Sequence, residues 1–475
     1  MDTKALRQKI LDLATHGKLV PQDPNDEPAS VLLERIKAEK ERLIKEGKIK
    51  RSKKSAKSSD TPHYENVPFE VPSSWVWCRL EDIAYVASGS TPDKTCFVEN
   101  GVPYIKMYNL RNQKIDFAYH PQYITEEVHN GKLQRSRTEV GDLIMNIVGP
   151  PLGKLAIIPT TLPQANFNQA AVLIRPYKFK EVLVSYLKVY LEEMSEINSI
   201  ATRGSAGQVN ISLTQSQNMR IPIPPLNEVR RIIEEVSKYD ILIDSLKQNI
   251  TDIQNLIAYT KSKILDLAIH GKLVLQDPND EPAIELLKRI NPDFTPCDNG
   301  HYPVGWIETI LGELFSHNTG KALNSSNKEG IFKDYLTTSN VYWNKFDFTA
   351  IKQMPFKESE LNKCTVTKGD LLVCEGGDIG RSAIWNYDYD ICIQNHIHRL
   401  RPKIDLCVPF YYYTFAYLKE NNLIGGKGIG LLGLSSNALH KIEMPLPPLA
   451  EQQRIVQKIE ELFSVLDNIQ NALEV

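Results

Sequence analysis

Few residue patterns in this sequence could support catalysis. Gly428–Gly433, with the sequence GIGLLG, has the glycine spacing of a dinucleotide-binding loop. It does not lie between a strand and a helix with an acidic residue about 20 positions on, which such a loop requires. No GxxxxGK[ST] phosphate-binding loop occurs, so the sequence encodes no P-loop ATPase motor.

Methyl transfer and metal chemistry are not indicated either. Gly149-Pro150-Pro151-Leu152 is the string nearest to the Asn/Asp-Pro-Pro-aromatic element of an amino-methyltransferase. It lacks the polar first residue and the aromatic ring that would hold an extruded base. His396 and His398 alternate on an expected strand and could ligate a metal, but no third ligand is indicated, so we interpret them as core or surface histidines. We therefore predict no catalytic, cofactor-binding or metal-binding residues.

Polar and cationic residues that could recognise nucleic acid gather in a few expected loops. The stretch 104–112 (YIKMYNLRN) combines amide, cationic and aromatic groups, and residues 203–210 (RGSAGQVN) form a polar loop whose glycines allow close backbone approach. The stretches 337–345 (TTSNVYWNK) and 425–436 (GGKGIGLLGLSS) correspond to them in the second half of the chain. Lys and Arg reach guanine edges or phosphates, and Asn or Gln can bind adenine through two hydrogen bonds.

These patterns give a set of candidate DNA contacts. The candidates in the first half of the chain are Lys106, Asn109, Arg111, Asn112, Lys154, Arg203, Ser205, Gln208 and Asn210. Those in the second half are Ser339, Asn340, Asn344, Lys345, Arg381, Lys427 and Ser435. For any one of them an ordinary surface loop is the competing interpretation.

The candidate loops belong to two segments of similar size, 62–225 and 292–447. Short apolar runs such as VPYIKMYNL and DLLVCEGG, bounded by Gly, Pro and Asn, are typical of strands. Each segment also has a helical stretch before its end, EVLVSYLKVYLEEMSEI in the first and VPFYYYTFAYLKENN in the second. We predict two α+β globules, each built on a mixed sheet.

An internal repeat relates the two halves of the chain. Residues 9–36 recur as 263–290 with 23 of 28 positions identical. Further pairs follow in the same order: Val71–Trp75 with Tyr302–Trp306, Gly141–Ile144 with Gly369–Leu372, and Ile221–Leu226 with Met444–Leu449. The candidate loops diverge most, which is what two different recognition sites on one scaffold would require.

The long stretch from Asn227 to His270 connects the two segments. Its apolar residues alternate at steps of three and four, with one interruption at Thr260, which is the pattern of a coiled-coil seam. The seam consists of Val229, Ile232, Val236, Tyr239, Ile243, Leu246, Ile250, Ile253, Ile257, Ile264 and Leu267. We predict one helix about 60 Å long, which needs a partner to cover its seam.

The offsets of the repeat identify that partner as the two ends of the chain. The C-terminal stretch 449–475 copies the first half of the central helix, and residues of about 3–20 copy its second half. Together the copies omit only Ile253 and Gln254. We predict a cyclic pseudo-two-fold repeat, with long antiparallel helices between the globules and the termini close together.

The resulting domain prediction has six segments. They are an N-terminal helical segment (1–36), a basic linker (37–61), a first globule (62–225), the central helix (226–291), a second globule (292–447) and a C-terminal helix (448–475). The linker is rich in Lys and Ser, and we expect it to be helical at its start and solvated rather than bound to phosphate.

Composition argues for a soluble protein and against unaided binding to nucleic acid. The net charge is −2, and the two globules carry 15 Lys/Arg against 15 Asp/Glu and 15 against 17. Balanced charge of this kind gives weak non-specific DNA binding. Seven scattered cysteines without a C-x-x-C pair, and no apolar run of a signal peptide or membrane span, predict a cytoplasmic protein with reduced thiols.

The sequence resembles the specificity subunits of type I restriction–modification enzymes over nearly its whole length. The resemblance lies in IPIPPLNEVRRI at 221–232, MPLPPLAEQQRI at 444–455, GSAGQVNISL at 204–213, the GKLV element after each seam and the cyclic duplication. It implies two target-recognition domains, each of which binds one half of a bipartite target, separated by two long antiparallel helices that set the spacer between the two halves. It also implies a non-catalytic reader of double-stranded DNA that docks two methyltransferase subunits and, through the complex, the endonuclease subunits.

Two other functions remain open at this point. A two-headed adaptor on a helical stalk, joining protein or glycan ligands, fits the duplication equally well but leaves the Asn-, Gln-, Ser- and Lys-rich loops unexplained. A nuclease with an unrecognised site is less favoured, because no paired carboxylate–lysine cluster is found.

Overall fold

The computed structural model describes residues 2–50, 67–149, 152–193, 210–295, 301–323, 329–424 and 434–474. The chain divides into two compact units, Asp2–Gln248 and Asn249–Val475. Each unit holds one globule and one set of packed helices. The division falls inside the central helix, near the place where the repeat has its cut.

The central helix α8 spans Leu226–Ile269, 44 residues, as predicted. Its seam is confirmed only in part. Val229, Ile232, Val236 and Ile243 are buried, whereas Tyr239, Ile253 and Leu267 are at least 36% exposed. In the last turns of α8, Leu265 and Ala268 are buried instead and join the core of the second globule. A straight α-helix drifts relative to a 3.5-residue repeat, so the buried stripe rotates from the partner helix towards the globule.

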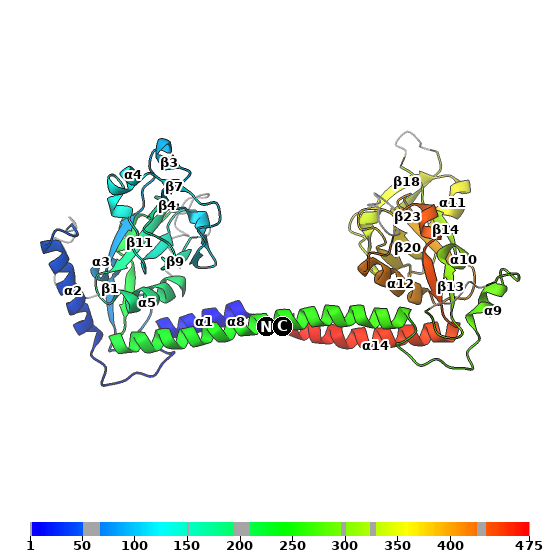
Figure 1. Ribbon diagram of the computed structural model, residues 1–475, viewed down its shortest axis with the longest axis horizontal. Coiled ribbons are helices and arrows are strands. Elements are labelled where there is room, and N and C mark those ends of the chain that lie inside the picture. The colour runs from blue at the N-terminus through cyan, green and yellow to red at the C-terminus, as the bar shows by residue number, and fades with distance from the viewer. Residues whose placement is uncertain are drawn as a thin grey trace. The chain divides into compact units, whose positions relative to one another are not determined.

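Helices from the two ends of the chain pack on α8, as the repeat predicts. Helix α1 (Thr3–Thr15) lies beside the first half of α8, and α14 (Leu449–Glu474) lies beside the second half (Figure 1). Within the first unit Arg7 pairs with Asp240 at 2.8 Å, and within the second Lys261 pairs with Asp467 at 2.5 Å. Helix α1 is shorter than the predicted 3–20, because Gly17 with a φ of +66° turns the chain away.

The joints between the helices and the globules repeat in detail. Gln22 donates to Glu228 in the first unit, and Gln276 donates to Glu451 in the second. The same correspondence relates the ion pairs Arg231–Asp26 and Arg454–Asp280, each at 2.6 Å. It also relates Gly17, which lies against Pro72 and Trp75, to Gly271, which lies against Pro303 and Trp306. We call these two sets of contacts the joints.

The described residues of the first globule form twelve strands and four short or medium α-helices. Its strands are β1 (Val76–Arg79), β2 (Ala84–Ser88), β3 (Phe97–Val98), β4 (Val102–Ile105), β5 (Leu110–Arg111), β6 (Lys114–Ile115), β7 (Tyr123–Ile124), β8 (Leu143–Asn146), β9 (Leu155–Ile157), β10 (Asn166–Phe167), β11 (Ala171–Pro176) and β12 (Arg220–Ile223). Its helices are α3 (Leu80–Ile83), α4 (Glu126–Asn130), α5 (Lys180–Glu193) and α7 (Leu213–Gln217).

Two four-stranded sheets form layers in this globule. The antiparallel sheet β2-β11-β8-β9 is buried on both faces, and α5 contributes to the core on one face. The other face packs on Ile105, Phe167 and the hairpin β5–β6. The second sheet, β10-β4-β7-β3, is mixed because β10 and β4 are parallel and the other pairs are antiparallel.

The second globule follows the same plan. Its strands are β13 (Ile307–Ile310), β14 (Phe315–Thr319), β15 (Ile331–Leu336), β16 (Val341–Tyr342), β17 (Lys345–Phe346), β18 (Lys352–Phe356), β19 (Thr365–Val366), β20 (Leu371–Cys374), β21 (Ser382–Ile384), β22 (Ile391–Ile393), β23 (Ile397–Pro402) and β24 (Glu443–Leu446). Its helices are α10 (Leu311–Leu314), α11 (Glu358–Cys364), α12 (Val408–Glu420) and α13 (Ser436–His440), with α9 (Ala283–Lys288) before it. The antiparallel sheet β14-β23-β20-β21 and the mixed sheet β18-β15-β22-β19 confirm the predicted α+β class.

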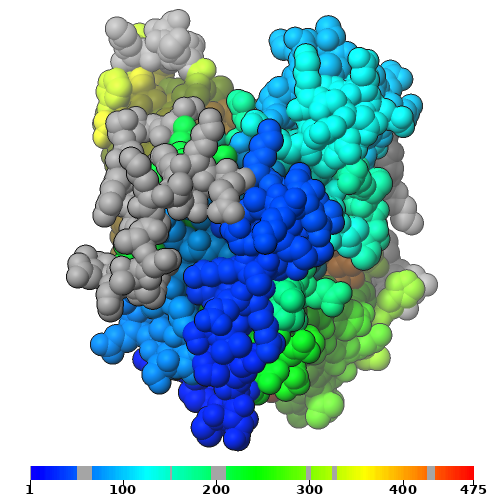
Figure 2. Space-filling view, turned by 90° about the vertical axis from the view of Figure 1, so that its left-hand side faces the viewer, coloured from blue at the N-terminus to red at the C-terminus, as the bar shows by residue number. Residues whose placement is uncertain are grey.

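In the first unit the expected linker is helical at its start, as predicted, because α2 (Ala29–Lys45) continues beyond the end of its counterpart α9. Helix α2 continues through residues 37–45 and buries Leu32, Leu33 and Ile36. Lys40 donates to the backbone of Glu81 at 2.7 Å, so this end of α2 is held against the first globule. Figure 2 shows this N-terminal segment, in dark blue, on the molecular surface. Residues 51–61 of the expected linker lie outside the described ranges.

Candidate nucleic-acid interface

Four candidate contacts of the first globule lie on or beside the hairpin β5–β6 and the 3₁₀ turn Met107–Asn109 before it: Lys106, Asn109, Arg111 and Asn112. Asn109 is fully buried. Its side-chain oxygen accepts from the Lys106 amide, and its NH₂ group donates to the carbonyls of Asp116 and Tyr119. This side chain therefore ties together both ends of the loop that carries the hairpin.

Arg111 lies on the exposed surface of the hairpin. Its guanidinium carbon lies 4.1 Å from the centre of the Tyr119 ring, and its Nε lies 3.7 Å from Asp116. Stacking on an aromatic face leaves the edge of a guanidinium available to other acceptors. Arg111 is thus oriented on a platform while its donors remain accessible.

The tip of this hairpin is a two-residue turn. Asn112 and Gln113 have φ values of 48° and 56°, which two-residue hairpin turns of the primed types require. Gln113 accepts a hydrogen bond from the Leu155 amide at 2.7 Å, so the tip is fastened to β9. Asn112 is exposed beside it.

Two further predicted contacts, Lys106 and Lys154, lie outside the two-residue tip of the hairpin. Lys106 is half-buried with its Nζ 5.5 Å from the centre of the Phe97 ring. Lys154 is half-buried at the start of β9, where its backbone exchanges hydrogen bonds with Asn146.

The second globule repeats the buried support. Asn340 is 2% exposed, its oxygen accepts from the Thr337 amide, and its NH₂ group donates to the Asp347 carbonyl. These bonds match those of Asn109. Both asparagines were predicted to contact DNA. That prediction is corrected here, because a buried amide with its donor and acceptor used inside the protein cannot reach a base edge.

The hairpin β16–β17 of the second globule carries a cationic cluster around Tyr342. Arg381 has its guanidinium carbon 5.1 Å from the centre of the Tyr342 ring and donates to the carbonyl of Thr338. Lys345 is exposed, with its Nζ 6.0 Å from the same ring. The structure thus brings together two predicted residues that are 36 positions apart in the chain.

The remaining polar candidates occupy different places. Asn344 is exposed at the tip of β16–β17 with a φ of 50°, and its amide donates to the Ser382 carbonyl. Ser339 is exposed and its hydroxyl lies 2.7 Å from that of Thr337. Ser435 caps α13 by accepting from the Ala438 amide, so its oxygen has a structural use. Asn210 is exposed and forms a bridge with Val148.

Four predicted contacts, Arg203, Ser205, Gln208 and Lys427, lie outside the described residues. Sequence reasoning also missed the platform residues Tyr119 and Tyr342 and the fastening residue Gln113. Gln113 directly follows the candidate Asn112, and Tyr342 lies within the stretch 337–345, so their positions next to chosen candidates could have indicated them. Nothing in the sequence indicates that Arg111 stacks on Tyr119.

His398, by contrast, is buried and belongs to a cluster of three histidines whose other members are half-buried. Its Nδ1 lies 2.8 Å from His317 Nε2, and its Nε2 lies 2.8 Å from the carbonyl of Leu434. The His440 ring packs edge-on against His317 at 4.8 Å. Within the described ranges no group of three or more His, Cys, Asp or Glu side chains is arranged to hold a metal ion. None of the described helices combines the length and apolar character needed to cross a bilayer.

We expect this cluster to make the second unit sensitive to acid. Burial, together with His398 and His440, lowers the pKa of His317 to about 4, from about 6.5 in an unfolded chain. The unfolded chain then binds the proton first, so stability present above pH 6.5 is lost as the pH falls towards 4. The loss reaches about 3 kcal/mol at 1.36 kcal/mol per pH unit.

Chemical denaturation at pH 7 and pH 4.5 measures this loss. His317→Gln should make the two unfolding free energies more nearly equal. His396→Gln is the matched control, because His396 is exposed and pairs with Glu375 at 3.2 Å. An equal effect of both variants would contradict the assignment.

Comparisons with known proteins agree with this architecture. The family described as type I restriction modification DNA specificity domain matches residues 72–255 and 303–475. The EcoEI specificity subunit of Escherichia coli is 28% identical over 99% of this chain and 91% of its own, and the EcoAI subunit of the same species is 27% identical over 98% and 90%.

Solved structures share the fold. The HsdS subunit from Thermoanaerobacter tengcongensis aligns with a TM-score of 0.53 and 19% identity, covering 85% of this chain and 93% of its own. A chain from a structure titled for complex assembly and conformational transition of the type I R-M system aligns with a TM-score of 0.56 and 20% identity, over 86% and 94%. Two matched specificity domains, each with its own hairpin and joint, show that this chain belongs to the type I restriction–modification DNA specificity family.

Proposed function

We propose that each globule reads one half of a bipartite DNA target through its hairpin. The observation that carries this proposal is that the two hairpins have the same buried asparagine support but different residues at their tips. Asn109 and Asn340 make the same backbone hydrogen bonds, whereas the corresponding tip positions differ: they are Arg111, Asn112 and Gln113 in one globule and Tyr342, Trp343 and Asn344 in the other. Guanidinium, ammonium and amide groups supply the donors and acceptors that base edges require.

The chain itself is proposed to be non-catalytic. The sequence lacks the motifs of a methyltransferase or a P-loop ATPase, so methyl transfer and cleavage would belong to partner subunits. The adaptor alternative has no support in the family assignment. The proposed compartment is the cytoplasm, where thiols such as the six described free cysteines stay reduced.

Two methyltransferase subunits are proposed to dock on the helices. In the first unit α8 exposes Ile241 and Leu242, and in the second unit Leu256, Tyr259 and Val465 are exposed on α8 and α14. Leu242 and Val465 occupy equivalent places in the repeat and are 61% and 55% exposed. Large exposed apolar side chains that gather on one element indicate a protein interface.

These partners would also supply most phosphate contacts, because the globules have balanced charge. Isolated chain should therefore bind random duplex weakly at physiological salt, with a shallow salt dependence. Tight binding with a steep salt dependence, measured by fluorescence anisotropy, would contradict the proposal that the partner subunits supply most phosphate contacts.

Domain exchange tests the reading function. Replacing residues 292–447 by the same domain of a relative should change one half of the methylated sequence, mapped genome-wide, and leave the other intact. On the wild-type scaffold, Lys345→Ala with Arg381→Ala should reduce discrimination in one half only, by about 1–3 kcal/mol for each lost base contact. Lys368→Ala is the control, because Lys368 is exposed and paired with Asp388. Changes in both halves would contradict the modular assignment.

A further inference from the structure

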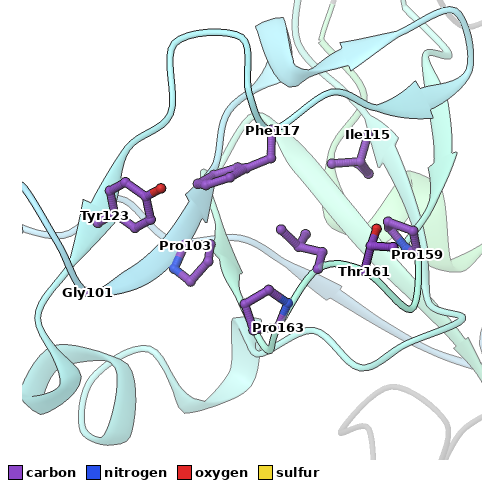
Figure 3. Close-up of a pocket in the computed structure, with 9 residues that line it drawn as sticks. Gly101, Pro103, Ile115, Phe117, Tyr123, Pro159, Thr161 and Pro163 are labelled. Carbon is purple, nitrogen blue, oxygen red and sulfur yellow. The ribbon is translucent and has the colours of Figure 1, made fainter.

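The first globule has a pocket with an uncharged lining beside its hairpin. It has a volume of about 360 Å³ and is lined by Gly101, Pro103, Ile115, Phe117, Tyr123, Pro159, Thr161, Leu162 and Pro163. The ring centres of Phe117 and Tyr123 lie 5.5 Å apart, and the two rings are arranged edge to face. Figure 3 shows these rings facing Pro103 and Pro163 across the pocket. The volume falls in the range of about 300–1,000 Å³ that is usual for small-ligand sites.

The repeat identifies the same place in the second globule. The Asp116 amide donates to Asn109 as the Asp347 amide donates to Asn340, so Phe117 corresponds to Phe348. Likewise the Gly141 amide donates to Ile158 as the Gly369 amide donates to Trp385. The pocket segment 159–163 (PTTLP) therefore corresponds to 386–390 (NYDYD).

In the second globule this place is filled by the chain's own aromatic rings. Trp385 is buried, and the centre of its ring lies 5.0 Å from the ring centre of Phe346, 6.1 Å from that of Phe348 and 4.6 Å from that of Tyr387. Its indole NH donates to the carbonyl of Tyr389 at 2.8 Å. The first globule has Ile158 in place of Trp385, Thr160 in place of Tyr387 and Leu162 in place of Tyr389. It thus keeps one ring of the wall, Phe117 in place of Phe348, and lacks the rings that pack on it.

The lining favours a side chain over a nucleobase. None of the nine lining residues is charged, whereas DNA interfaces are strongly positive. A base held by its edge needs several fixed donors and acceptors, and only Tyr123 and Thr161 bring side-chain polar atoms here. An aromatic side chain seated in an uncharged, ring-lined pocket is the usual anchor of a protein interface.

We propose that this pocket receives an aromatic side chain of a partner polypeptide, taking the place that tryptophan and tyrosine rings fill in the second globule. The site lies in the recognition domain, apart from the exposed apolar residues of α8 and α14. It does not depend on the DNA-reading function, since its occupant is protein.

Ligand-observed saturation-transfer NMR on the full chain tests the site with N-acetyl-tryptophanamide as the probe. We expect millimolar binding of this probe and at least tenfold weaker binding of N-acetyl-leucinamide and thymidine. Thr161→Trp places an indole in the pocket from an exposed position and should weaken probe binding at least tenfold. Asn100→Trp is the matched control, because Asn100 is exposed next to the lining residue Gly101 without lining the pocket itself.

A second variant keeps the test independent of how Thr161→Trp folds. Tyr387→Ala opens the equivalent place in the second globule and should add a second site for the probe. The proposal is overturned if the wild-type chain binds the probe no better than Thr161→Trp does. Equal binding of thymidine at the pocket would overturn it too. Retained methylation specificity alongside either result would leave the proposed reading function standing.

Discussion

Inserting seven residues of helical sequence after Asn249 should lengthen the spacer between the two halves of the target by roughly three base pairs. Seven residues make about two turns and add about 10 Å to α8, and base pairs are stacked about 3.4 Å apart. Two whole turns nearly preserve the facing of the residues on either side, so neither hairpin should change the bases that it reads. Mapping of methylated sites would show the longer spacer directly.

The control for this insertion is an insertion of the same length outside α8. Residues 291–295 connect α9 to the second globule and are largely exposed, so seven added residues there should leave the spacer as it is. A spacer that stays constant when α8 is lengthened would refute the proposal that this helix sets the distance.

Replacing Asp370 by Ala should destabilise the second globule by about 2–3 kcal/mol, the scale for losing hydrogen bonds to a buried charged group. Asp370 is 1% exposed and accepts from Arg401 at 2.7 and 2.6 Å and from the Thr367 amide. Without the carboxylate, the guanidinium and the buried amide lose their acceptor. Recognition of one target half should be lost first, because the equivalent Asp142–Arg175 pair of the first globule remains.

Chemical denaturation of the full chain measures the change. Asp388→Ala is the matched control, because Asp388 forms an exposed ion pair with Lys368 and its loss should change stability far less. Equal destabilisation by the two variants would show that burial of Asp370 does not matter. The reciprocal variant Asp142→Ala should affect the other half of the target.

Much of the fold could be predicted because the apolar periodicity identifies the long helix and the repeat identifies which distant segments pack on it. The bounds of α8, the packing of α1 and α14 on it, and the α+β class of both globules follow from these patterns. Exposure of Tyr239 and Ile253 could not be predicted, because it depends on the facing of each turn relative to its partner helix. The end of α1 at Gly17 was missed because a glycine's positive φ is set by the joint that it packs against.

The candidate site could be predicted as a region and less so by residue. The stretches 104–112 and 337–345 each contain the first strand of an exposed hairpin. Amides within them cannot be sorted by sequence, since Asn109 and Asn112 differ only in burial. The clustering of Arg381 with Lys345 around Tyr342 depends on the pairing of β20 with β21, which brings distant loops together.

The two joints have a consequence for how new specificities can arise. Each globule enters and leaves through the same pairing, Val76 with Ile223 in one and Ile307 with Leu446 in the other. Each also rests on the same glycine, proline and tryptophan. A globule that fits one joint should therefore fit the other. A chain that carried the first globule twice would read the same half-site at both ends, and exchange at the joints could combine half-sites freely without redesign of the helices.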